Sequence, residues 1–232
     1  MSVHLLRQIE RLKKRILALG ALVEESFEGG IRAVQLRDPV LARQIVANDD
    51  RIDQMEIDVE EECLQTLALH QPVAFDLRFV VAVLKINNDL ERIADLAVNI
   101  AEVAEHLAEH PRLEAIPIDL PTMTRKVQWM LKGCLDALVN IDTGLARQVR
   151  EMDDQVDEIH RGNYTRIEHQ IIDNTRQTGV LLHYLSISRY LERIADHAVN
   201  VAEDVNYMAQ GDILRHSRIH TIPKDEGQGV GG

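Results

Sequence analysis

The chain has 232 residues, a formal net charge of -12 and only 3% aromatic residues. This negative charge argues against a nucleic-acid partner, which requires a basic surface, and favours cations or basic protein surfaces. Gly and Pro are scarce and no alternating β-type runs occur, so the composition indicates an all-α protein. With no secretory signal and no run of membrane-spanning length, we expect a cytoplasmic protein without direct membrane insertion.

Apolar residues recur at helical spacing along most of the chain, and they predict six helices. We expect these helices at residues 3–36, 38–70, from 72 or 76 to 110, around 127–138, at 142–173 and at 177–209. Asp38 followed by Pro39 is typical of a helix start, and Asp142 opens the fifth helix in the same way. Glycines at 20, 29 and 30 weaken the first helix locally and can mark a bend.

A proline-rich stretch divides the predicted helices into two groups. Residues 111–121, PRLEAIPIDLP, contain three prolines, so we place a linker there. Short connections make sequential helices antiparallel neighbours, which predicts a three-helix bundle in residues 1–110 and another in residues 122–216. The Gly-rich polar residues 217–232 are expected to form a flexible tail.

The two groups are copies of one another. Residues 90–102, LERIADLAVNIAE, recur as LERIADHAVNVAE at 191–203, with 11 of 13 positions identical. DDRID at 49–53 matches DDQVD at 153–157, with an offset of 104 in place of 101. Repeats this close indicate an internal duplication, so the two bundles should be pseudo-symmetric.

The duplication yields four acid-x-x-x-acid pairs, two in each half. They are Asp49/Asp53, Glu91/Asp95, Asp153/Asp157 and Glu192/Asp196. The i,i+4 spacing places each pair on one helix face, bordering the apolar stripe, so the two pairs of each half can converge when the helices pack. Carboxylate oxygens are hard ligands that suit Mg²⁺, Ca²⁺, Mn²⁺ or iron. We therefore expect bound divalent or trivalent metal ions, with Mg, Mn, Fe and Zn left open.

Two other interpretations stay open at this point. The acidic pairs can be a solvated surface with Arg92 and Arg193 as ion-pair partners, which would make the protein a metal-free helical scaffold. A carboxylate-bridged metal enzyme is the other alternative, but the Glu-x-x-His pairs of ferritin-like di-iron proteins are missing. The sequence contains no nucleophile elbow and no Gly-rich phosphate loop, so we expect no enzymatic activity. Four histidines, His106, His110, His160 and His169, are interpreted as surface imidazoles, and Cys63 as a core thiol.

These motifs together resemble those of the PhoU family of bacterial phosphate-transport accessory proteins. The resemblance rests on DDRID, on HQPVAFDLR at 70–78, on both ERIADxAVNxAE copies and on GDILRH at 211–216. It implies two three-helix bundles side by side and metal binding at the four acidic pairs.

The resemblance also implies a regulatory role without catalysis. That role is negative control of the phosphate (Pho) regulon and modulation of uptake by the phosphate ABC transporter. The implied partners are the phosphate-sensing histidine kinase and the transporter ATPase, and the implied oligomer is a homodimer.

Overall fold

The computed structural model describes residues 3–210, and in this range the chain is all-helical. The helices are α1 (Val3–Leu36), α2 (Pro39–His70), α3 (Ala74–Glu109), α4 (Leu120–Asn140), α5 (Thr143–Asp173) and α6 (Thr178–Gln210), with a short 3₁₀ turn, η1 (Thr175–Gln177). The expectation of an all-α chain with six helices is confirmed. The predicted tail at 217–232 and the GDILRH motif lie outside the described residues.

Aspartates fix three of the helix starts. Asp38 and Asp142 each accept two backbone N–H hydrogen bonds from the first turns of α2 and α5, and Asp119 accepts one from the first turn of α4. Each such cap contributes about 1 kcal/mol to helix stability. The cap at Asp119 places the start of α4 at Leu120, so the helix includes the last two residues of the predicted linker. Pro121 sits in the first turn of α4, where its missing N–H is not needed.

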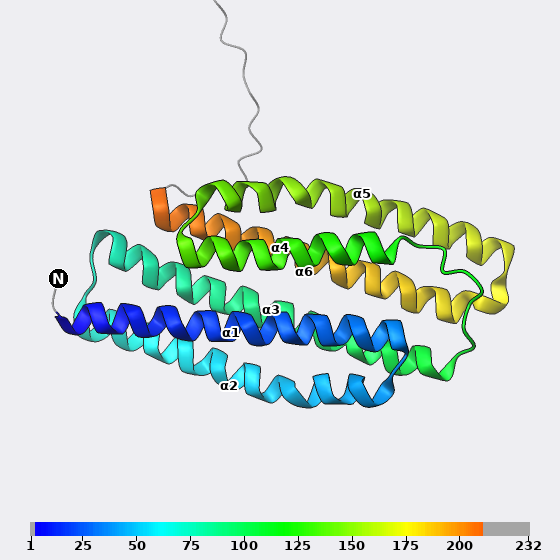
Figure 1. Cartoon of the computed structure of the whole chain (residues 1–232), viewed down its shortest axis with the longest axis horizontal. Coiled ribbons are helices and arrows are strands. Elements are labelled where there is room, and N and C mark those ends of the chain that lie inside the picture. The colour runs from blue at the N-terminus through cyan, green and yellow to red at the C-terminus, as the bar shows by residue number, and fades with distance from the viewer. Residues whose placement is uncertain (1–2, 211–232) are drawn as a thin grey trace, which may run out of the picture.

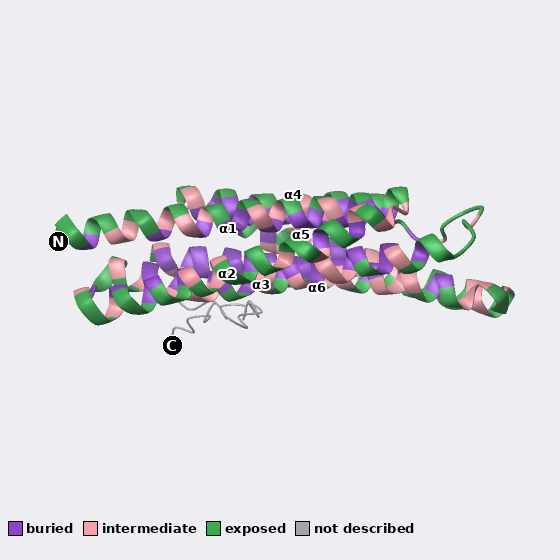
Figure 2. Ribbon diagram, turned by 90° about the horizontal axis from the view of Figure 1, so that it is seen from below, coloured by how far each residue is buried: buried purple, intermediate pink, exposed green. Residues whose placement is uncertain are grey.

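Each half is an antiparallel three-helix bundle, and the two bundles lie side by side (Figure 1). The central helices α3 and α6 run antiparallel against each other, and α1 and α4 do the same, while α2 and α5 occupy the outer edges. Buried residues gather along the inner helix faces (Figure 2) and form one apolar core that continues across both halves. The halves are thus related by an approximate twofold axis.

Polar contacts cross the interface between α3 and α6. Asp89 is buried and accepts hydrogen bonds from His197 Nδ1 at 2.8 Å and from Asn200 Nδ2 at 3.1 Å. Lys85 Nζ lies 3.0 Å from Asp204 Oδ1. His197 therefore joins the two halves through a contact that Leu96, its counterpart in the first copy, cannot make.

The glycines of α1 lie where this helix approaches other helices. A Cβ atom on Gly30 would lie 2.8 Å from the carbonyl oxygen of Ala97 in α3, and one on Gly20 would lie 2.6 Å from Leu135 Cδ2 in α4. The missing side chain at position 30 lets the two backbones come close together. α1 runs through all three glycines as a single helix. Between residues 3 and 210 no helix combines the length and the apolarity needed to span a membrane.

Candidate metal centres

In each half, the acidic pair of the outer helix faces the acidic pair of the central helix. Burial, followed by the charges of Asp53 and Asp95, raises the pKa of Asp49 to about 6. Burial, followed by charged neighbours of which Asp196 acts most strongly, raises the pKa of Asp153 to about 7. Asp95 and Asp196 stand on the central helices, so these charges act across the helix pair. We call the two groups the first and second acidic clusters; they comprise Asp49, Asp53, Glu91 and Asp95, and Asp153, Asp157, Glu192 and Asp196.

The glutamates of the two clusters behave in the same way. Burial and the charge of Asp95 raise the pKa of Glu91, and burial and the charge of Asp157 raise the pKa of Glu192. A raised carboxyl pKa means that the ionised forms are held close together with incomplete hydration. Six of the eight predicted ligands are half-buried, and the remaining two, Asp53 and Asp196, are exposed.

One buried oxygen in each cluster has no hydrogen-bond partner among the described residues. These atoms are Oδ1 of Asp49 and Oδ1 of Asp153, which occupy equivalent positions in the two halves. A buried acceptor without a partner costs about 1–3 kcal/mol, and more when it is charged. A cation bound at each cluster would supply the missing contact, so the residues present fit a hard metal ion.

The side chains do not, however, form a closed ligand set. Within residues 3–210, no three His, Cys, Asp or Glu side chains are grouped closely enough to hold a metal ion. The structure therefore brings the predicted residues onto facing helix surfaces but does not bring their carboxylates to one point. Metal binding at either cluster requires side-chain rotation toward the neighbouring helix.

The two clusters differ in their cationic neighbours. Arg92 lies 3.3 Å from Glu91 and 3.2 Å from Asp95, whereas Arg193, its counterpart, has no carboxylate within 4.0 Å in the described chain. Arg92 is exposed, and an exposed ion pair contributes about 0–1 kcal/mol. The first cluster thus has an arginine in direct contact with its carboxylates, whereas Arg193 acts on the second only at longer range, where its charge still lowers the pKa of Glu192 and Asp196.

Sequence reasoning missed a polar contact that recurs beside each cluster. In the first half Glu56 accepts a hydrogen bond from Asn87 Nδ2 at 3.0 Å, and in the second half His160 Nδ1 lies 2.9 Å from Ser188 Oγ. The repeat offsets of 104 and 101 place these two residue pairs at equivalent positions of the two halves. The sequence signal that could have revealed the contacts was this equivalence. His160 was interpreted as a surface imidazole, but it is half-buried and burial lowers its pKa.

The other residues singled out from the sequence lie largely as expected. His106, His110 and His169 are exposed, and the rings of His106 and His110 both contact the ring of His183. Cys63 is fully buried and carries no disulfide, in agreement with its interpretation as a core thiol.

Acidification is expected to stabilise the metal-free protein through the aspartates with raised pKa. The folded state binds the additional protons, so this contribution is fully present below the unfolded pKa of 3.8 and is lost as the pH rises through about 6 for Asp49 and about 7 for Asp153. At pH 8, Asp153→Asn should therefore raise the Tm of chelator-treated protein by roughly 3–6 °C, and the gain should shrink toward pH 5.

Thermal unfolding followed by circular dichroism at pH 5 to 8 checks this expectation. Comparison with Glu158→Gln, an exposed neighbour on α5, separates the effect of the cluster from that of total charge. An equal Tm gain in both variants, or a gain that does not depend on pH, would contradict it.

Fold and site define a class: a duplicated helical protein whose two domains pack antiparallel and carry matching acidic clusters. The sequence matches the PhoU domain twice, over residues 16–104 and 120–205. The chain belongs to the PhoU family.

Named relatives cover nearly the whole chain. A "phosphate-specific transport system accessory protein PhoU homolog" from Aquifex aeolicus is 35% identical over 217 residues, which span 94% of this chain and 98% of that protein. A homolog from Pseudomonas aeruginosa with the same name is 34% identical over 90% of this chain and 86% of its own length. These names describe accessory proteins, so family membership supports the expectation that this protein is not an enzyme.

Solved structures show the same fold. The crystal structure of PhoU from Pseudomonas aeruginosa is similar with a TM-score of 0.86 and 34% identity, and the match covers 89% of this chain and 99% of that one. The phosphate transport system regulatory protein PhoU from Streptococcus pneumoniae is similar with a TM-score of 0.79 and 27% identity, over 90% and 98% of the two chains.

Proposed function

We propose that this protein is a cytoplasmic negative regulator of the phosphate regulon that also modulates uptake through the phosphate ABC transporter. The observation that carries this proposal is the match of both halves to the PhoU domain, together with relatives named as accessory or regulatory proteins of phosphate transport. The similarity extends over both domains and not over one shared domain alone. The proposal therefore takes the regulatory role of those relatives to be a role of the whole molecule.

The mechanism proposed is that of an adaptor between the phosphate-sensing histidine kinase and the transporter ATPase. An elongated helical body with a net charge of -12 offers long surfaces to basic patches on cytoplasmic domains. Charge complementarity of this kind raises the association rate and the specificity more than the affinity. A homodimer is part of the proposal, since two copies would present each docking surface twice.

Metal ions belong to the proposal as structural elements. The eight carboxylates of the two acidic clusters would hold them, and the partnerless oxygens of Asp49 and Asp153 are the observation in favour. A bound cation cancels repulsion among the carboxylates and fixes the outer helix against the central helix. Without metal, the carboxylates of each cluster place negative charges on facing helices. At neutral pH the repulsion between these charges lowers the stability of the folded protein.

Deletion of the gene in its host, grown with ample phosphate, tests the regulatory proposal. Phosphate-starvation genes should be switched on, and a plasmid copy of the gene should silence them again. Purified protein should also capture the cytoplasmic domain of the kinase and the ATPase. Starvation genes that stay silent after deletion, together with no capture of either partner, would overturn the proposal.

A further inference from the structure

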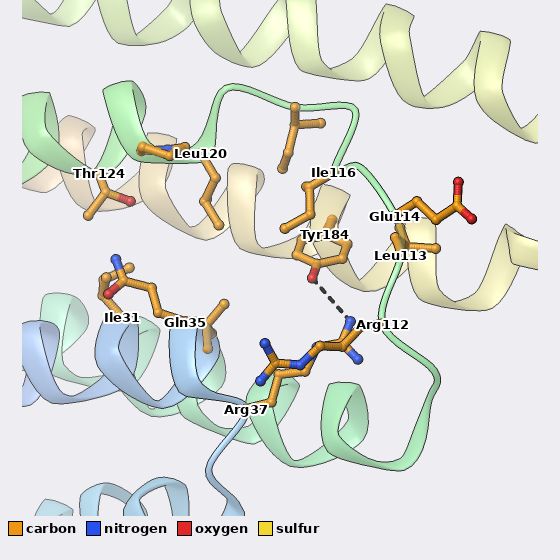
Figure 3. A pocket seen from close by; sticks show the side chains of 13 residues that line it. Ile31, Gln35, Arg37, Arg112, Leu113, Glu114, Ile116, Leu120, Thr124 and Tyr184 are labelled. Atoms are coloured by element: carbon orange, nitrogen blue, oxygen red, sulfur yellow. Dashed lines mark hydrogen bonds between the residues drawn. The ribbon is translucent and has the colours of Figure 1, made fainter.

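A cavity at the junction of the two halves lies away from both acidic clusters. It has a volume of about 480 Å³ and is walled by the end of α1, the linker, the start of α4 and one residue of α6 (Figure 3). A volume of this order is typical of sites for small organic ligands, about 300–1,000 Å³. Its apolar walls include Ile31, Val34, Ile116, Ile118 and Leu120.

Two guanidinium groups line the same cavity, although the protein as a whole is acidic. Arg37 donates to the hydroxyl of Tyr184 at 3.2 Å and to the backbone carbonyl of His110 at 2.9 Å, and Arg112 donates to the carbonyl of Leu36 at 3.2 Å. All these acceptors are neutral. Neither arginine has a carboxylate within 4.0 Å in the described residues, so both positive charges remain available to an anion.

A second polar group in the wall lacks a partner. Thr124 is 8% exposed, and its Oγ1 is buried without a hydrogen bond in the described structure. In Figure 3, Thr124 lies at one end of the cavity and the two arginines at the other, with Leu120 and Ile116 between them. Glu114 is the one acid among the described residues that line the cavity, and its carboxylate points away from the arginines.

From this arrangement we infer that the cavity binds a small organic anion with an apolar body. Arg37 and Arg112 hold its carboxylate or phosphate head, the isoleucine and leucine walls cover its body, and Thr124 hydrogen-bonds a hydroxyl or carbonyl group at its far end. Arginine suits the head because its planar fork matches both carboxylate and phosphate oxygens. The neutral acceptors already hold the guanidinium of Arg37 in place, which lowers the entropy lost on binding.

Because the cavity lies between the two halves, a ligand bound in it would affect how the halves pack together. Ile31 and Val34 belong to the first half, whereas Leu120, Thr124 and Tyr184 belong to the second. A ligand that touches both halves stabilises their packing by mass action, so it should raise the Tm in proportion to the logarithm of its concentration. The site is thus suited to sense a metabolite through the junction between the two domains.

Titration of the full chain, labelled at isoleucine δ1 methyl groups, tests the inference by NMR. The probes are octanoate, octyl phosphate, 8-hydroxyoctanoate, neutral 1-octanol and inorganic phosphate. We expect saturable shifts at Ile31, Ile116 and Ile118 with the two octyl anions, tighter binding with the hydroxylated probe, and weak or no binding with octanol or phosphate alone. The octanoate and octyl phosphate arms distinguish the two head groups.

Arg37→Gln and Arg112→Gln should each weaken octanoate binding at least tenfold, whereas Arg7→Gln, at the far end of α1, should leave it unchanged. Thr124→Val should abolish the preference for 8-hydroxyoctanoate and spare octanoate. Since Arg37 also joins two backbone segments, a Tm equal to wild type is required of its variant, and Arg112→Gln supplies the independent test.

Three results would overturn the inference: no saturable methyl shifts, octanol binding as tightly as octanoate, or full affinity in both arginine variants. If, without any probe, the methyl signals of Ile31, Ile116 and Ile118 shift with protein concentration while other isoleucines do not, a second copy of the chain occupies the cavity, and the inference is overturned.

Discussion

The double variant Glu91→Gln/Asp95→Asn should bind no more than half as much metal per chain as the wild type. This variant loses the two carboxylates that α3 supplies to the first acidic cluster, whereas the second acidic cluster keeps all four of its carboxylates. Adding Glu192→Gln and Asp196→Asn should remove the remaining metal. Elemental analysis of protein equilibrated with Mn²⁺, Fe²⁺ or Zn²⁺ and then freed of excess ions gives the metal content directly.

The same chain offers a matched control for that experiment. Glu105→Gln/Glu109→Gln removes an i,i+4 acidic pair from the same helix, about three turns beyond the cluster, and should leave metal content unchanged. A metal that binds only the folded state raises the Tm, so on the proposed metal binding added metal should raise the Tm of the wild type and of the control, but not that of the fourfold variant. Metal content and Tm equal in all variants would mean that the acidic pairs are a solvated surface, with Arg92 as an ion-pair partner.

The second large effect is expected at Gly30, where α1 touches α3. Gly30→Ala should lower the free energy of unfolding by about 1–3 kcal/mol, because the added Cβ meets a backbone oxygen that cannot rotate away. This loss appears even though alanine favours a helix over glycine by about 1 kcal/mol. Urea denaturation followed by far-ultraviolet circular dichroism measures the change.

Gly162→Ala is the control, because nothing lies within 4 Å of a Cβ added at that position of α5. There only the helix preference acts, so the protein should become more stable by about 0.5–1 kcal/mol. Opposite signs for two identical substitutions in helix interiors would establish the close contact between α1 and α3. Equal gains in both variants would contradict it.

Helix ends were predictable because their determinants are local. Asp38 and Asp142 cap the helices that follow them, and Pro39 stands next to Asp38, so short stretches of sequence decide where α2 and α5 begin. The acidic clusters were predictable for a different reason. The repeat offsets show that acidic pairs occur at equivalent positions of corresponding helices in the two halves. Because each pair borders an apolar stripe, it lies near the neighbouring helix once the stripes pack together.

Contacts between non-equivalent residues were not predictable in this way. Asp89 and His197 stand at positions that differ between the two copies, so neither the repeat nor the helical period pairs them. Convergence of the carboxylates depends on side-chain rotation, which periodicity does not describe. The cavity is walled in part by the linker, whose irregular backbone has no period, and the sequence therefore gave no sign that Arg37 and Arg112 share it.

The contact between Asp89 and His197 also bears on how a duplicated gene became one protein. If a lone first domain paired with a second copy of itself in the same antiparallel manner, Asp89 would keep an amide from Asn99 but would face Leu96 where His197 now stands. A lone second domain would place His197 against Tyr190. The contact at Asp89 and His197 is thus specific to the fused pair of halves, and a homodimer of either separated half would lack it.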